Sequence, residues 1–224
     1  MVFYFKDKES YLFPSHEKYE SELTKNVYDT HYSYSDKDPI VPSLQYIISH
    51  NMFQASCVVP IEDLCVNYNK DEDINKDFCD KYNIPCFRLG RKGGAIVFFP
   101  GNIAVDAIYL GTNKELPYFF REDFISFLRS HGIETELDNN DIMVDNKKVA
   151  GVVYTEIANK YSYLGMAISI NSDVDLINQI CTKPMIKIPG ALSDYGITTE
   201  KMMNWILTWL NTHKYIEGEY INEA

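Results

Sequence analysis

Apolar residues recur at helical spacing in four parts of the chain. The pattern is clearest in the stretch that ends before Gly132, where a C-terminal cap would stand, and it is formed by Phe120, Phe124, Phe127 and Leu128. A second stripe follows Thr198 and Thr199, either of which can cap a helix, and it consists of Met202, Ile206, Trp209 and Leu210. Shorter helices are predicted from His16 to Lys25 and from Ile74 to Tyr82.

Short apolar runs between turn residues predict strands. In chain order they are Ala55–Val59, Ile84–Leu89, Ala95–Phe99, Ile103–Leu110, Asp141–Val144, Lys148–Tyr154 and Tyr163–Asn171. The connection Asp145–Lys147 predicts a β-hairpin, because Asp and Asn tolerate a positive φ. Helices and strands alternate without a repeat or a Pro/Gly/Ser-rich linker, which indicates a single α/β domain over residues 1–224.

Charge and cysteine content narrow the function classes. The chain of 224 residues has 21 Lys and Arg against 32 Asp and Glu, a formal net charge of −11, which argues against nucleic-acid or anionic membrane partners. There is no transmembrane-length apolar run and no signal-peptide pattern. The five cysteines are scattered without CxxC spacing, so we expect reduced thiols and a cytoplasmic location.

A basic, glycine-containing turn is the first candidate site. It is predicted between two buried strands and includes Arg88, Arg91, Lys92, Gly93, Gly94 and Ala95, with Gly101 and Asn102 after the second strand. Adjacent glycines let the backbone approach a ligand and turn its N–H groups toward an anion, and the basic side chains add positive charge. The turn can therefore hold a phosphate or carboxylate, although a basic surface turn explains the same residues.

The second candidate site is the predicted hairpin. Asn140 and Asp141 lie across it from Lys148 and Gly151, so a carboxylate and an ammonium meet on adjacent strands. Asp141 can contact a nucleotide or Mg²⁺ while Lys148 holds an anion. An ordinary cross-strand ion pair is the alternative interpretation.

Taken in order, these two clusters resemble the biotin/lipoate protein ligase superfamily, and they are closest to its lipoate–protein ligase catalytic domain. The similar residues are an arginine-led glycine turn, a strand, Gly101-Asn102, then Asn140-Asp141 and Lys148-x-x-Gly151, within approximately Asp73–Asp173. The hairpin part is shared with biotin ligases, whereas the glycine turn with Gly-Asn favours the lipoate branch.

The resemblance implies a fold, a reaction and a role for each matching residue. The fold is a class II biotin/lipoyl synthetase-like catalytic domain, a mixed β-sheet flanked by helices. Because little more than one helix follows the strand that ends at Asn171, we expect the C-terminal accessory domain of many lipoate ligases to be absent. Lipoate or octanoate is activated by ATP with Mg²⁺ to acyl-AMP, and the acyl group passes to a lysine of a lipoyl carrier domain. Lys148 is the implied catalytic residue, at the acyl carbonyl and phosphate. The other implied contacts are Gly93, Gly94 and Ala95 with the acyl-adenylate, Asn102 with the phosphate, and Asn140 and Asp141 with the nucleotide.

The sequence departs from this family at three places, which leaves alternatives open. Leu89 replaces the second member of an arginine pair, Arg91-Lys92 replaces serine and a glycine, and Phe98-Phe99 replaces His-Asp. An acyl-binding relative without catalysis is therefore one alternative. Another is an ATP-independent octanoyl or lipoyl transferase that uses Cys181 as its nucleophile, although Cys181 is flanked by Ile and Thr and not by Pro and Gly. A separate accessory polypeptide, or the loop Tyr28–Pro42, is expected to complete the site.

Overall fold

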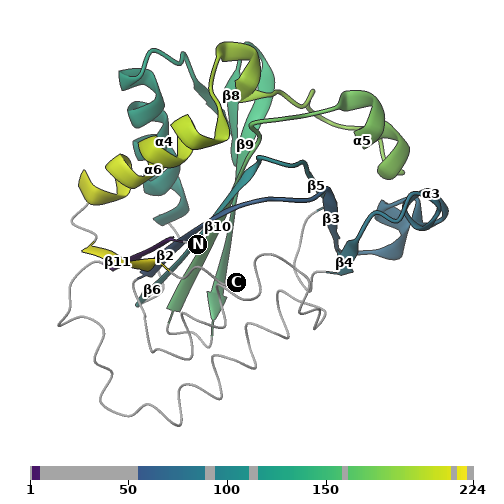
Figure 1. Cartoon of the computed structure of the whole chain (residues 1–224), viewed down its shortest axis with the longest axis horizontal. Helices are drawn as coiled ribbons and strands as arrows, with labels where there is room; N and C mark the ends of the chain where they lie inside the picture. The colour runs from purple at the N-terminus through teal and green to yellow at the C-terminus, as the bar shows by residue number, and fades with distance from the viewer. Residues whose placement is uncertain are drawn as a thin grey trace, which may run out of the picture.

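Two β-sheets with helices against them form the fold (Figure 1). The computed structural model describes residues 2–5, 55–88, 94–110, 116–157, 161–212 and 216–220. The larger sheet has eight strands in the order β11-β1-β2-β6-β10-β9-β8-β7, and all neighbouring pairs are antiparallel. These strands are β1 (Val2–Phe5), β2 (Ala55–Pro60), β6 (Ile103–Leu110), β7 (Glu136–Asp138), β8 (Asp141–Val144), β9 (Lys147–Ile157), β10 (Tyr161–Ile168) and β11 (Ile216–Tyr220).

The smaller sheet has three strands, with β3 (Cys65–Tyr68) between β4 (Cys86–Arg88) and β5 (Ile96–Phe98). The β3–β4 pair is parallel and the β3–β5 pair is antiparallel. The predicted class, mixed β-structure flanked by helices, is confirmed, and the parallel pairing lies in this small sheet. No helix in the described part of the chain has the length and apolar character needed to cross a bilayer.

Two long helices cover one face of the large sheet (Figure 1). They are α4 (Leu116–Ser130) and α6 (Thr199–Thr212), and their buried side chains share one apolar cluster with β6, β8, β9 and β10. The rings of Phe124 and Trp209 lie 5.0 Å apart between centroids, and the indole N–H of Trp209 donates to Asp123 at 2.6 Å. Because this face carries the core, the opposite face of β8 and β9 remains for polar groups.

A second apolar cluster lies against the small sheet. Its helices are α3 (Lys76–Lys81) and α5 (Val174–Ile180), two short segments from distant parts of the sequence. The buried members of the cluster are Val66, Tyr68, Ile74, Cys79, Ile84 and Ile180. Two 3₁₀ helices, η2 (Asp71–Asp73) and η3 (Leu192–Tyr195), complete the described helical elements.

Most predicted elements are confirmed within the described residues. The helix after Ile74 ends before Asn83, which has φ +54°, and α4 ends before Gly132 as its cap residue predicted. Thr198 accepts the N–H of Lys201, so it is the residue that caps α6. Met202, Ile206 and Trp209 are buried as the stripe predicted.

Several observed elements were not predicted, and two predicted segments lie outside the residues that the structure describes. Strands β1, β3, β7 and β11 and helix α5 are absent from the sequence-based prediction, because each spans only three to seven residues and is too short to show a clear periodic pattern. The predicted helix His16–Lys25 and the loop Tyr28–Pro42 lie outside the described residues, as does the side chain of Leu210.

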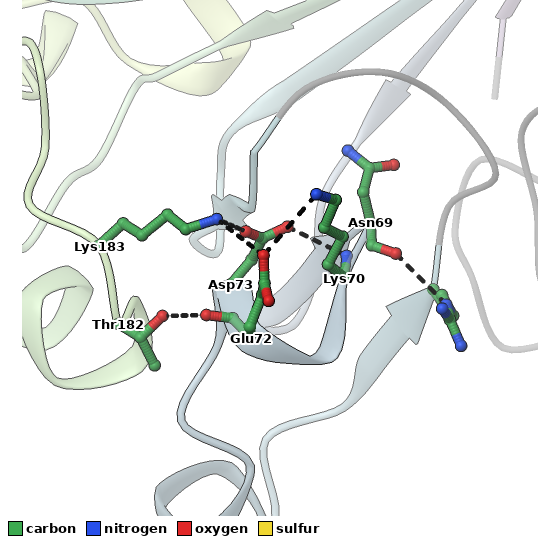
Figure 2. A network of polar contacts seen from close by, with 7 residues as sticks. Asn69, Lys70, Glu72, Asp73, Thr182 and Lys183 are labelled. Atoms are coloured by element: carbon green, nitrogen blue, oxygen red, sulfur yellow. Dashed lines mark hydrogen bonds and ion pairs between the residues drawn. The ribbon is translucent and has the colours of Figure 1, made fainter.

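A buried carboxylate in η2, the 3₁₀ helix before α3, joins that helix to the segment after α5 (Figure 2). Asp73 accepts the Lys183 ammonium at 2.5 Å and the backbone N–H of Lys70 at 3.0 Å. On the same side, the Thr182 hydroxyl donates to the backbone carbonyl of Glu72. The hydrogen bond from Lys183 holds the pKa of Asp73 below its usual value of 3.8. These contacts tie residues 70–73 to residues 182–183.

We predict that Asp73→Ala destabilises the fold in a pH-dependent way. The Asp73 side chain is 5% exposed, and its loss removes the acceptor of both the partly buried Lys70 N–H and the Lys183 ammonium, so the free energy of unfolding at pH 7 falls by roughly 1–3 kcal/mol. Because the folded-state pKa is lowered, this contribution is present above about pH 4 and disappears as the pH falls through the folded value. Chemical denaturation at several pH values measures the difference.

Glu72→Ala is the matched control for this prediction. The Glu72 side chain is 67% exposed and lies 3.6 Å from the same lysine, so its removal is expected to change stability by less than about 0.5 kcal/mol. Equal destabilisation by the two variants would contradict the assigned role of Asp73.

Candidate active site

The candidate active site is built on the hairpin of β8 and β9. Asp145 and Asn146 form its turn with φ values of +48° and +61°, which is the pattern of a type I′ turn and confirms the predicted hairpin. Across the two strands, Lys148 Nζ lies 2.8 Å from Asp141 Oδ1. The structure therefore brings together the two charged residues that the sequence singled out.

An extra residue in β9 explains the Lys-x-x-Gly spacing. Residues three apart in a regular strand point to opposite faces, since side chains alternate. Here Ile142 pairs with Ala150 but Met143 pairs with Lys148, which leaves Val149 as a β-bulge. Val149 and Ala150 both join the core cluster, so Lys148 and Gly151 both lie on the opposite face.

Gly151 is the position over which the Lys148 side chain passes. A Cβ at Gly151 would lie 3.1 Å from Lys148 Nζ and 3.2 Å from Asp141 Oδ1, closer than ordinary van der Waals contact. The absence of a side chain at Gly151 therefore allows the ion pair to lie flat against β9. Lys148 stays 42% exposed, so its ammonium is accessible to a ligand.

Asn140 is held from the helical side of the sheet. The buried Arg121 of α4 donates from Nη1 to Asn140 Oδ1 at 2.5 Å, and the Asn140 carbonyl accepts the N–H of Val152 at 3.0 Å. The turn before Asp141 is thus fixed by both side-chain and backbone contacts. Sequence reasoning missed Arg121, because α4 carries several charged residues and nothing in the sequence distinguishes this one.

Lys187 is a second residue that sequence reasoning missed. Its Nζ lies 2.9 Å from Asp138 Oδ2 and 3.0 Å from Asp141 Oδ2, and it donates to the Asp138 carbonyl at 2.6 Å. Burial lowers the pKa of Lys187, but the hydrogen bonds to Asp138 and Asp141 outweigh it, so the pKa lies above its usual value. Asp141 is therefore bound by one lysine on each oxygen.

Asp141 does not fit the predicted role of Mg²⁺ ligand. A divalent cation on this carboxylate would meet the ammonium groups of Lys148 and Lys187, both within 3.0 Å of its oxygens. Among residues that the structure describes, no three or more His, Cys, Asp and Glu side chains are grouped to hold a metal. We therefore assign no metal to Asp141.

The structure describes the residues on either side of the glycine turn, Arg88 before it and Gly94 and Ala95 after it. Residues 89–93, which include Arg91, Lys92 and Gly93, lie outside the described residues. Arg88 donates from Nε to the Asn69 carbonyl at 3.3 Å, and the Asn69 amide donates to the Gly94 carbonyl at 3.2 Å. Asn69, a residue without a sequence signal, thus joins both ends of the turn. Ala95 packs against the cluster at the small sheet.

Gly101 and Asn102 form a third group of contacts. Gly101 has φ +86°, and a Cβ there would lie 2.6 Å from the Thr199 hydroxyl, so this turn requires glycine. Asn102 is 2% exposed, and its Oδ1 accepts the N–H groups of Ile170 and Asn171 at 3.0 and 2.9 Å. The side-chain carbonyl of Asn102 therefore accepts hydrogen bonds from within the fold. The contact of Asn102 with phosphate stays a prediction.

Cys181 lies at the C-terminal end of α5 and packs against the cluster at the small sheet. Burial raises the pKa of its thiol, with smaller contributions from Cys79 and Asp73. A nucleophilic cysteine requires the opposite shift, toward the thiolate. The surroundings of Cys181 therefore do not favour the cysteine-dependent transferase.

The fold is that of lipoate–protein ligases. A bi-partite lipoate protein ligase from Thermoplasma acidophilum, described with its E2 lipoyl domain, aligns with a TM-score of 0.59 and 16% identity over 67% of this chain and 68% of that chain. A lipoate-protein ligase A bound with ATP aligns with a TM-score of 0.59 and 18% identity over 67% and 69%. A T. acidophilum protein with bound lipoic acid aligns with a TM-score of 0.55 and 17% identity over 67% and 69%. No curated protein sequence matches this chain.

The chain belongs to the lipoyl protein ligase A/B catalytic domain family, whose model matches residues 65–216. That range contains the hairpin of β8 and β9, the glycine turn and Asn102. The predicted resemblance to the lipoate branch and the prediction of an enzyme domain are confirmed. The roles of the individual site residues remain predictions.

We predict that Asn102→Ala destabilises the fold by roughly 2–3 kcal/mol. The reason is that two backbone N–H groups lose their acceptor, and the first of these hydrogen bonds, from Ile170, is buried. The measurement is the free energy of unfolding in urea. Asn171→Ala, which removes an exposed side-chain bond to the Pro100 carbonyl, is the control and should cost less than about 1 kcal/mol. A smaller effect for Asn102→Ala than for Asn171→Ala would show that the Asn102 carbonyl is not needed for folding.

Proposed function

We propose that this protein activates lipoate or octanoate with ATP and transfers the acyl group to a lysine of a lipoyl carrier domain. In the first step a carboxylate oxygen of the acid attacks the α-phosphorus of ATP, and the bond to pyrophosphate breaks. In the second step the carrier amine attacks the acyl carbonyl, loses a proton, and AMP leaves. Family membership and neighbours solved with lipoic acid or ATP support the proposal.

The observation that carries the proposal is the ion pair above Gly151. Lys148 lies on the face of β9 opposite the core and is partly exposed, while Asp141 directs its ammonium along the strand. A fixed ammonium in this position stabilises the charge that develops on the acyl carbonyl and the phosphate oxygens. Removing one such donor typically raises a barrier by about 3–4 kcal/mol.

Asn140 and the glycine turn supply the remaining predicted contacts. Arg121 orients the Asn140 amide, so its nitrogen is available to a nucleotide acceptor. Gly94 and Ala95 follow the turn, where backbone N–H groups can meet the acyl-adenylate. We propose that Mg²⁺ binds together with ATP through the triphosphate, which is a common mode of Mg²⁺ binding. No step of the proposed reaction is assigned to the metal.

The acyl acceptor requires a second protein. The proposed partner is a lipoyl carrier domain, and a separate accessory polypeptide completes the site. The support is the T. acidophilum neighbour, which is described as a bi-partite ligase together with an E2 lipoyl domain. A reactive acyl-adenylate must be kept from water, so a closing partner would raise the yield of transfer.

A single assay tests the proposal. The protein is incubated with lipoate or octanoate, ATP and a lipoyl domain, and the domain is weighed by mass spectrometry while AMP release is measured. An acyl adduct that requires ATP supports it. No adduct and no AMP release with any medium-chain acid would refute it, and transfer that persists without ATP but is lost in Cys181→Ser would establish the cysteine transferase.

We predict that Lys148→Ala lowers the rate of adenylate formation roughly 10²- to 10³-fold, since it removes the ammonium at the reacting oxygens. The melting temperature should change by less than about 2 °C, because the side chain is partly exposed. Lys147→Ala is the matched control, since Lys147 pairs with Val144 and lies on the other face of the hairpin. Activity of Lys148→Ala within a few-fold of wild type would contradict the catalytic assignment.

A further inference from the structure

Lys187 reaches the hairpin through a segment that lies beside the start of β9. The N–H of Lys148 donates to the Ile188 carbonyl at 2.8 Å, and the N–H of Gly190 donates to the Lys148 carbonyl at 2.8 Å. This pairing places Pro189 opposite Lys148 in a parallel bridge. Since alternate residues of an extended segment share a face, Lys187 points to the same face as the Lys148 side chain.

The Lys187 ammonium is saturated by its neighbours. It has three N–H donors, and it meets three acceptors. These are Asp138 Oδ2, the backbone carbonyl of Asp138 and Asp141 Oδ2. Its side chain is 16% exposed, against 42% for Lys148. Lys187 is therefore a fixed cation, whereas Lys148 contacts Asp141 from an open position.

Asp141 lies between these two lysines and connects them. Its Oδ2 is held by Lys187 at 3.0 Å, so its Oδ1 is presented in one direction, 2.8 Å from Lys148 Nζ. A carboxylate held at one oxygen loses its rotational freedom, and a long lysine side chain that follows it loses freedom as well. Without Lys187, Asp138 and Asp141 would repel each other, and Asp141 would turn away from this position.

We propose that Lys187 is a positioning residue, which holds Asp141 so that Asp141 aims the Lys148 ammonium at the reacting oxygens. The inference rests on the proposed function for the reaction itself, but the positioning of Asp141 is independent of it. The high pKa of Lys187, which its bonds to Asp138 and Asp141 maintain against burial, keeps this cation charged at neutral and alkaline pH.

The first test is structural and needs no activity. In a crystal structure of Lys187→Gln, Asp141 is expected to adopt another rotamer and the Lys148–Asp141 contact to be lost. In Lys187→Arg, which keeps the charge, both should be retained. An unchanged Asp141 and an intact contact in Lys187→Gln would overturn the inference whether or not the protein is a ligase.

The second test separates positioning from stability and from net charge. Lys187→Gln should lower kcat for adenylate formation roughly 10- to 100-fold with little change in KM for the acid, and Lys187→Arg should recover most of it. Lys147→Gln, which also removes one positive charge and lies next to Lys148 in the hairpin, should leave kcat within about 2-fold, since its side chain lies on the other face. An equal loss in Lys147→Gln, or an unchanged kcat in Lys187→Gln, would overturn the inference.

A replacement variant covers the case in which Lys187→Gln does not fold. If Lys187→Gln does not fold, Asp138→Asn replaces it, because it weakens the hold on Lys187 at a half-exposed side chain and should lower kcat in the same direction. An unchanged kcat in a folded Asp138→Asn would then overturn the inference. A wild-type protein without any ligation activity refutes the proposed function alone, since the rotamer of Asp141 still decides the role of Lys187.

Discussion

The candidate site depends on one extra residue in a β-strand. Strand side chains alternate between faces, so Lys148 and Gly151 could not share a face in a regular β9. Because of the bulge at Val149, the side chains of two consecutive residues, Val149 and Ala150, both point into the core. Gly151 therefore lies on the same face of β9 as Lys148. The core therefore determines the geometry of the polar face: burial of Val149 and Ala150 stabilises the bulge, and the bulge sets the position of the lysine.

Buried polar groups hold the other segments of the fold in place. The Asn102 carbonyl accepts two backbone N–H groups at the end of β10, and Thr199 at the start of α6 donates to the Gly101 carbonyl at 2.8 Å. Asp73 performs a similar role beside the small sheet, where it joins η2 to the segment after α5. A buried polar atom without a partner is costly, so each of these contacts specifies one arrangement of chain segments that are distant in sequence.

The charges around the hairpin are compatible with the anionic substrates that we propose for this acidic protein. The chain has a net charge of −11, which by itself repels a phosphate. At the hairpin, however, Asp138 and Asp141 are each bound to Lys187, and Lys148 extends beyond them toward solvent. The carboxylates thus orient the lysine while their own charge is balanced nearby. This arrangement favours Asp141 as an orienting group over Asp141 as a metal ligand.

The sequence alone determined the features that depend on neighbouring residues. The turn at Asp145-Asn146, the end of α4 before Gly132, the stripe of α6 and the pairing of Asp141 with Lys148 follow from local backbone preferences and from periodicity. Only the tertiary structure showed that Arg121 holds Asn140, that Asn69 joins the ends of the glycine turn, and that Lys187 binds Asp141. Those contacts join residues that packing brings together from separate elements. A charged side chain in a helix or loop carries no local signal of the partner that it will meet, because that partner is selected by the fold as a whole.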